Sequence, residues 1–261
     1  MNPTKAALSL GFLAMLAAAP AQATVIVTYA EAPKSETSSL VNTTTENFNS
    51  LSTGIHTNVV WDGVGTFDKL NILAANQYGG AANTNYSVQG VGSSVSQTIL
   101  NLDQASGYFG LWWSAGDASN VLDFYSGPNG TGTLVAEFTT ANLLKALSKS
   151  YYGNPNSGTY SGQDAGEPFA YINFFATGDT TWSSVVFRNS SNSGFEADNY
   201  SSRVQNYNEA TDGAMPGVLL EEINGTSTVS LVPEPNGTLA MVLVGGLSLG
   251  GSALRRFKRK A

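Results

Sequence analysis

The chain of 261 residues contains no cysteine and a single histidine. The lack of cysteine excludes disulfide bonds, thiol nucleophiles and cysteine-ligated zinc or iron–sulfur sites. A domain without such cross-links needs a sizeable hydrophobic core, or a bound ion, to be stable. The only histidine, His56, lies in a polar Thr- and Asn-containing segment, which is typical of a surface residue. A Ser-His-Asp hydrolase would have to use it, so catalysis of that kind is disfavoured.

Charged residues are scarce, at 12% of the chain, and they are unevenly distributed. All 19 acidic residues but only six of the 12 basic ones lie between Thr24 and Pro235, which leaves this segment strongly acidic. Such a surface repels nucleic-acid phosphates and anionic lipid, and we expect no nucleic-acid partner. Acidic patches do suit divalent cations, Ca²⁺ above all.

Long hydrophobic runs occur only at the two ends of the chain. At the N-terminus, Lys5 precedes an apolar stretch over Ala6–Ala19, the length expected for the core of a signal peptide. Ala21 and Ala23 then place small residues at the two positions that a signal peptidase reads. The pattern predicts a signal peptide over residues 1–23, cleaved so that the mature chain begins at Thr24. An uncut membrane anchor is the alternative.

At the C-terminus, Val232-Pro233-Glu234-Pro235 precedes an uncharged run over Thr238–Leu254, near the lower length limit for crossing a bilayer. A basic tail over residues 255–261 follows, with Arg255, Arg256, Lys258, Arg259 and Lys260. The positive-inside rule predicts that this tail stays cytoplasmic. The residues alone therefore predict a transmembrane helix in the inner membrane with almost no cytoplasmic domain.

This order of Pro-Glu-Pro, apolar helix and basic cluster resembles the PEP-CTERM sorting signal of cyanobacterial and proteobacterial exosortase-dependent surface proteins. The resemblance implies that an exosortase recognises Pro233, Glu234 and Pro235 and removes the helix and tail. It also implies a Gram-negative host that makes extracellular polysaccharide. The expected organisation is a signal peptide (1–23), an ectodomain (24–231) and a sorting signal (232–261). A plain C-terminal anchor is the competing interpretation.

Within the ectodomain, alternation of apolar and polar residues indicates about ten short strands. They are expected at 25–29, 66–73, 95–102, 107–114, 119–125, 133–139, 169–176, 183–188, 194–200, 218–223 and 227–231. Gly127-Pro128-Asn129-Gly130 and Asn224-Gly225 are turn signals between strands. One short helix is expected over Thr140–Leu147 with Thr140 as N-cap, an irregular layer over 31–58, and a loop over 201–216. The pattern predicts an all-β fold, an antiparallel β-sandwich that is jelly-roll-like.

The centre of the ectodomain, residues 95–200, also resembles a group of exosortase-dependent surface proteins. The matching stretches are GYFGLWWSAGD (107–117), LDFYS (122–126), EPFAYINFF (167–175) and GFEADN (194–199). The resemblance implies cellular location and fold, and no catalytic activity comes with it.

Trp112 and Trp113 are adjacent and should point to opposite faces of a strand. Phe109, Leu111 and Trp113 are expected to face the core, which leaves Tyr108 and Trp112 on the other face. Exposed aromatic rings there could stack on the apolar face of a sugar ring. A covering layer or loop explains them equally well.

Glu196 and Asp198 are expected to share one face of a strand, where two carboxylates repel each other unless a cation or solvent intervenes. Asn199, with Asp117 and Asn120 from a neighbouring loop, could complete a Ca²⁺ site of oxygen ligands. A solvated acidic face is the simpler interpretation. The pair could also serve as acid and nucleophile of a glycoside hydrolase, although one strand rarely flanks a scissile bond alone.

The sequence therefore predicts a non-enzymatic surface or matrix protein, exported and then sorted by an exosortase. We expect it first at the inner membrane and afterwards at the cell surface or in the medium, associated with exopolysaccharide or a biofilm. A carbohydrate-binding module is the first alternative and a secreted hydrolase the second. No cofactor is required by the sequence, with Ca²⁺ the one candidate.

Overall fold

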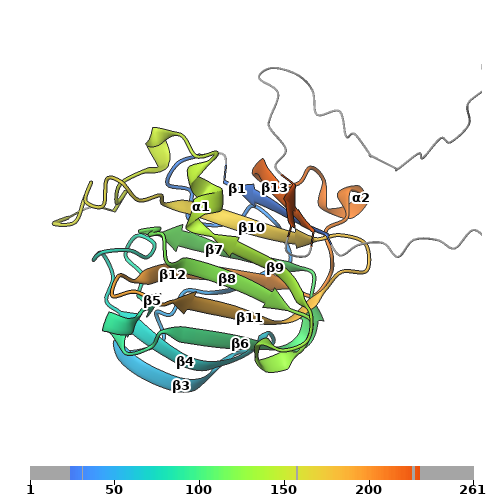
Figure 1. Ribbon diagram of the computed structural model, residues 1–261, viewed down its shortest axis with the longest axis horizontal. Coiled ribbons are helices and arrows are strands. Elements are labelled where there is room, and N and C mark those ends of the chain that lie inside the picture. Colours follow the sequence, from blue (N-terminus) through green and yellow to red (C-terminus); the bar gives the residue numbers. More distant parts are fainter. Residues whose placement is uncertain (1–23, 31, 157, 225–226, 230–261) are drawn as a thin grey trace, which may run out of the picture. The chain divides into compact units, whose positions relative to one another are not determined.

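The computed structural model describes residues 24–30, 32–156, 158–224 and 227–229 (Figure 1). The chain divides into a compact unit that ends at Leu231 and a second unit over Val232–Ala261. The predicted signal peptide, the sorting motif, the transmembrane helix and the basic tail lie outside the described residues. In the part that is described, no helix is long and apolar enough to cross a bilayer.

The described residues form an antiparallel sheet with few helical turns. Its strands are β1 (Thr24–Tyr29), β2 (Thr44–Glu46), β3 (Gly54–Trp61), β4 (Gly65–Leu73), β5 (Tyr86–Gln89), β6 (Gln97–Ser106), β7 (Tyr108–Ser114), β8 (Asn120–Tyr125), β9 (Leu134–Thr139), β10 (Ala170–Ala176), β11 (Trp182–Asn189), β12 (Phe195–Arg203), β13 (Val218–Asn224) and β14 (Ser227–Val229). The two α-helices are α1 (Thr140–Leu144) and α2 (Glu209–Asp212). The strand order is β14-β13-β1-β10-β7-β12-β5-β4-β6-β11-β8-β9, with β2 beside β12 and β3 beside β4.

The sheet curls so far that its two ends approach each other. Strand β9 at one end contacts β13 and β1 near the other, and Figure 1 shows β3 and β4 on the opposite side of the molecule from β1 and β13. Aromatic rings meet across the enclosed space: Phe109 on β7 lies 6.1 Å from Phe124 on β8, and Trp113 on β7 lies 5.4 Å from Phe138 on β9. The all-β, antiparallel prediction is confirmed in this form, a nearly closed sheet around one aromatic core.

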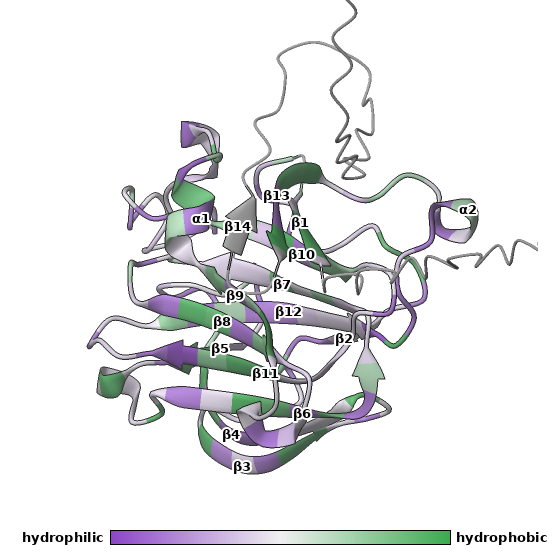
Figure 2. Ribbon diagram, turned by 45° about the vertical axis from the view of Figure 1, so that its right-hand side comes forward, coloured by the Kyte–Doolittle hydropathy of each residue, from purple (hydrophilic) through white to green (hydrophobic). Residues whose placement is uncertain are grey.

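The alternation of side chains explains which face of each strand meets that core. Phe109, Leu111 and Trp113 belong to the main core cluster, as predicted, whereas Trp112 belongs to a smaller cluster on the other side of β7. Figure 2 shows the same mixture of hydrophilic and hydrophobic residues along outer strands such as β8. Strand β10 is buried along its whole length between β1 and β7.

Several local predictions were wrong. Strand β3 and the short β2 form where an irregular layer was expected, and β5 was not predicted at all. Strand β12 continues to Arg203 and α2 follows, where a loop over 201–216 was expected. The N-cap of α1 is Thr139 rather than Thr140, because the Thr139 N–H and hydroxyl both donate to Asn142 Oδ1, at 2.9 and 2.8 Å.

The first predicted turn is confirmed. Pro128–Gly130 forms a single 3₁₀ turn between β8 and β9, with Asn129 at a φ of 54°. Strands β13 and β14 pair antiparallel with Asn224 opposite Ser227, and Gly225 of the second predicted turn lies outside the described residues.

Candidate functional site: a pocket beside strand β12

The segment that joins β4 to β5, residues 74–85, covers the outer face of β7 and β12. The indole N–H of Trp112 donates to the Gly80 carbonyl at 2.8 Å. The Asp198 carboxylate accepts a hydrogen bond from the Ala81 N–H at 3.0 Å. These contacts close over the face of Trp112, so of the two interpretations of this face the covering loop is confirmed.

The predicted glycan platform is therefore wrong. Tyr108 and Trp112 have no exposed surface, so neither ring can receive a sugar. Tyr108 packs on Phe175 at 5.1 Å between ring centroids, and its hydroxyl donates to Asn173 Oδ1 at 2.9 Å. Trp61, a further aromatic in the same segment of sequence as His56, is also buried and stacks on Phe67.

Two of the five predicted Ca²⁺ ligands lie together at the start of β8. The Asn189 amide donates to Asn120 Oδ1 at 2.7 Å and to Asp117 Oδ2 at 3.2 Å. Asp117 Oδ1 accepts from the Ser119 N–H at 2.7 Å. Asn120 is fully buried, and its acceptor oxygen is already used. This pair is therefore a protein-internal hydrogen-bond cluster, with only part of Asp117 exposed.

Two further predicted ligands, Asp198 and Asn199, face other partners. Asp198 is fully buried, and Thr84 donates its hydroxyl to the carboxylate at 2.5 Å. Burial raises the pKa of Asp198 to about 7, although hydrogen bonds from Thr84, Ala81 and Asn199 oppose that shift. Asn199 donates its amide to the Glu36 carbonyl at 3.0 Å. The five predicted residues are thus divided among separate environments.

Glu196 is the predicted residue whose carboxyl borders open space. It is 7% exposed, and it lies where two glycines approach it closely. A Cβ on Gly79 would fall 2.4 Å from Glu196 Cβ, and one on Gly194 would fall 2.0 Å from Glu196 Oε1. Burial, reinforced by neighbouring carboxylates, raises the pKa of Glu196 to about 8.

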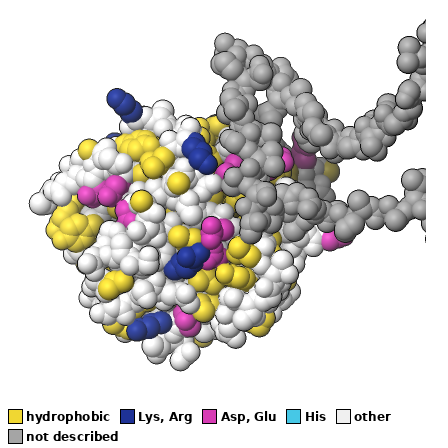
Figure 3. All heavy atoms as spheres, in the orientation of Figure 1, with side chains coloured by type: hydrophobic (Ala, Val, Ile, Leu, Met, Phe, Trp, Pro, Cys, Tyr) yellow, Lys and Arg dark blue, Asp and Glu magenta, His cyan; other side chains and the backbone are white. Residues whose placement is uncertain are grey.

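Those carboxylates come from loops that are distant in sequence. Asp117, Asp164 and Glu167 line a cavity of about 260 Å³ together with Glu196 and Tyr78. Burial raises the pKa of Asp164 and Glu167 as well. Figure 3 shows charged side chains scattered over one face of the molecule, and such residues make up 12% of the chain. Four carboxyl groups around one cavity are therefore a local concentration of acidic residues.

The carboxyl groups do not converge on a single point. Among the described residues, no group of three or more His, Cys, Asp or Glu side chains is arranged to hold a metal ion. The sequence reasoning missed Tyr78, Asp164 and Glu167, since loop residues carry no periodic signal. Glu167 does begin one of the stretches that carry the family resemblance.

The geometry also disfavours Glu196 and Asp198 as a glycosidase pair. A hydrolase needs both carboxyls to flank one bond in a shared cleft. Glu196 borders the cavity, whereas the Asp198 carboxylate is bonded to Ala81 and Thr84 beneath the β4–β5 segment. The two groups therefore face different surroundings despite their spacing in sequence.

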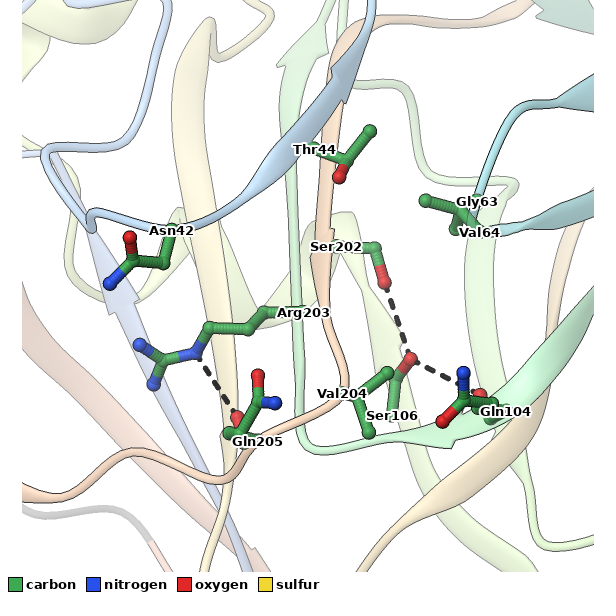
Figure 4. A pocket seen from close by; sticks show the side chains of 10 residues that line it. All are labelled: Asn42, Thr44, Gly63, Val64, Gln104, Ser106, Ser202, Arg203, Val204 and Gln205. Carbon is green, nitrogen blue, oxygen red and sulfur yellow. Dashed lines mark hydrogen bonds between the residues drawn. The ribbon is translucent and has the colours of Figure 1, made fainter.

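A separate cavity, of about 170 Å³, lies beside the end of β12 (Figure 4). Arg203, which lines this cavity, forms a buried ion pair with Asp212 at 2.8 Å. The hydrogen bond from Arg203 lowers the pKa of the Asp212 carboxyl. The Ser106 and Ser202 hydroxyls are 3.3 Å apart and bond each other. Arg203, Ser106 and Ser202 therefore have hydrogen-bond or ion-pair partners within the protein.

The only histidine lies elsewhere. His56 Nε2 lies 2.7 Å from the Ser52 carbonyl oxygen, so its ring contacts the backbone.

The residues expected to carry sorting, Val232 to Pro235 and the basic tail, lie outside the described residues, as do Ala21 and Ala23. Thr24, the predicted first residue of the mature chain, is the first residue of β1. A comparison with protein families, curated proteins and solved structures found no match for this chain.

Proposed function

We propose that this chain is an exported, non-enzymatic surface protein whose C-terminal signal is processed by an exosortase. One observation carries the proposal: the Pro233–Pro235 motif, the apolar run and the basic cluster stand in order at the C-terminus of a chain with a signal-peptide pattern. The compact unit ends at Leu231, immediately before this signal. This boundary coincides with the start of the expected sorting signal, so removal of the signal would leave the compact unit whole.

On this proposal the protein passes from the inner membrane to the cell surface or medium. Signal peptidase and exosortase are its processing partners, and extracellular polysaccharide is its expected surrounding. The excess of acidic residues supports the exclusion of nucleic acid as a partner. The curled antiparallel sheet is compatible with a jelly-roll-like sandwich, and we propose that finer description for the fold.

The test is the intact mass of the protein recovered from its native host, with envelope and medium compared. We expect a mass that begins at Thr24 and ends near Pro235. A double variant, Pro233→Ala with Pro235→Ala, should keep the tail and stay in the envelope. Pro216→Ala, outside the motif, is the matched control and should be processed normally. A wild-type mass that runs through Ala261 would overturn the proposal.

A further inference from the structure

Two adjoining cavities lie on either side of Tyr78 and Glu196. The first, of about 260 Å³, has carboxylate walls, and the second, of about 310 Å³, is lined by uncharged residues apart from Glu196. They share Tyr78, Ser193, Gly194 and Glu196. Pockets for small molecules run from about 300 Å³ upward. Two linked cavities of this size suit a short chain of small units better than one compact ligand.

Tyr78 is an exposed aromatic ring that the fold holds in place. It is 50% exposed, and its ring packs edge-on against Tyr160 with centroids 4.9 Å apart. The buried Asn154 amide donates to the carbonyls of Gln77 and Tyr78, at 2.9 and 3.1 Å. An immobilised ring loses little conformational entropy on binding. Tyr78 therefore offers a ready flat surface at the mouth of both cavities.

Glu196 supplies a buried hydrogen-bonding group in the same walls. The residue is 7% exposed, and within the described ranges the only hydrogen-bond donor to its carboxyl is its own backbone N–H. A buried carboxyl with so few partners is costly, so a ligand that brings hydroxyl or ammonium donors would be favoured. The backbone at Gly79 and Gly194 approaches Glu196 so closely that a side chain at either position would collide with it. Glu196 also lines both cavities, so a ligand in them can reach it.

The spacing of the acidic groups argues for a ligand wider than an ion. Ca²⁺ needs six to eight oxygens at about 2.3–2.6 Å. The described residues provide no such convergence of three acidic side chains. A pyranose ring instead carries hydroxyl donors around its rim and an apolar C–H face, which can lie on an aromatic ring. The carboxylates of Asp117, Asp164 and Glu167 in the first cavity repel glycans that contain uronic acids or sulfate.

We propose that the cavities around Tyr78 and Glu196 bind a non-acidic oligosaccharide, one ring of which stacks on Tyr78 while its hydroxyls bond the carboxylates. Every residue involved precedes Leu231. The site therefore does not depend on whether the sorting signal is removed, and either proposal can fail without the other.

The test measures binding by titration calorimetry with the full chain, kept in a detergent that has no sugar headgroup. The probes are a cellulose hexamer, a glucosamine hexamer and polygalacturonate. We expect millimolar or tighter binding of at least one of the first two and none of the third. Tyr78→Ala should weaken binding at least tenfold, whereas Tyr78→Phe, which keeps the ring, should stay within threefold. Tyr125→Ala, a partly exposed tyrosine outside both cavities, should bind as wild type does.

Three outcomes would overturn the proposal. The first is no binding of either non-acidic hexamer at 10 millimolar, roughly the weakest affinity that matters here. The second is binding that survives Tyr78→Ala unchanged in a variant that melts like wild type. The third is a thermal shift produced by Ca²⁺ alone and abolished by Glu196→Gln, which would assign the carboxyl groups to a cation.

Discussion

On the inner face of β7, Leu111 and Trp113 pack among rings from β8, β9 and β12, whereas on the outer face Trp112 meets a loop through a hydrogen bond. Both faces are fully buried. The inner face is closed by one large apolar cluster, and the outer face by smaller apolar clusters together with polar contacts such as Asp198 to Ala81. Apolar packing stabilises a buried face through many small contacts, whereas a covering loop depends on a few directional hydrogen bonds. The two faces should therefore differ in how they respond to substitution and to pH.

The inner face should give the largest effect. Trp113 lies 4.4 Å from Phe195 and 5.4 Å from Phe138, between ring centroids. Trp113→Ala should lower the free energy of unfolding by about 3–5 kcal/mol, because it leaves a cavity among rings that cannot collapse. Denaturant titration measures this. Val60→Ala, at a side chain 68% exposed, should change it by less than about 0.5 kcal/mol. A Trp113→Ala loss as small as that of the control would contradict an aromatic core.

The outer face should make stability depend on pH. The folded protein raises the pKa of Glu196 from 4.5 to about 8 and that of Asp198 from 3.8 to about 7. Above the unfolded values, the folded state binds protons that the unfolded chain releases, so stability falls as pH rises through this window. At about 1.4 kcal/mol per pKa unit, Glu196 alone should remove about 3–4 kcal/mol between pH 5 and pH 8.

Glu196→Gln isolates this contribution. The variant has no proton to lose, so its stability curve should be flatter over the same pH range than that of the wild type. Glu137→Gln, at a carboxylate 47% exposed beside Arg188, is the matched control and should keep the wild-type slope. Wild-type stability that rises from pH 5 to pH 8 would show that the outer-face carboxyls are not desolvated.

The two faces of β7 also show which features of the fold could be predicted from the sequence. Alternation predicted most strands because it reports which residues face a core, whatever that core is. Strand β3 was missed because it pairs only with β4 and has a single buried residue, and β5 because four residues are too few for a period. Whether Trp112 is covered depends on a segment around Gly80, which is distant in sequence. The residue types of β7 would look the same in the sequence if this face were exposed.

The candidate site was only half predictable for the same reason. Glu196 and Asp117 were identified because carboxylates beside a strand are visible in the sequence. Tyr78, Asp164 and Glu167 reach the cavity from loops, whose paths depend on hydrogen bonds such as those of Asn154. Contacts of this kind have no periodicity and join segments far apart along the chain. They can be found only once the fold is known.

The smallest effect comes from a pair of neighbouring tryptophans that differ in one bond. Trp112 Nε1 donates to the Gly80 carbonyl at 2.8 Å, whereas Trp113 Nε1 has no acceptor among the residues that the structure describes. Trp112→Phe and Trp113→Phe remove the same atoms, so both lose packing, but only the first loses a hydrogen bond. Trp112→Phe should therefore cost about 1 kcal/mol more in the free energy of unfolding.

Hydrogen exchange locates that loss. In Trp112→Phe the amides of Gly80 and Ala81 should exchange faster than in wild type, because the β4–β5 segment opens locally while the aromatic core stays closed. Trp113→Phe should leave those two amides as protected as they are in wild type, once global stability is allowed for. If both variants speed exchange in the segment equally, apolar packing rather than the Trp112 hydrogen bond holds the outer face. The two faces of β7 would then differ only in the residues that form them.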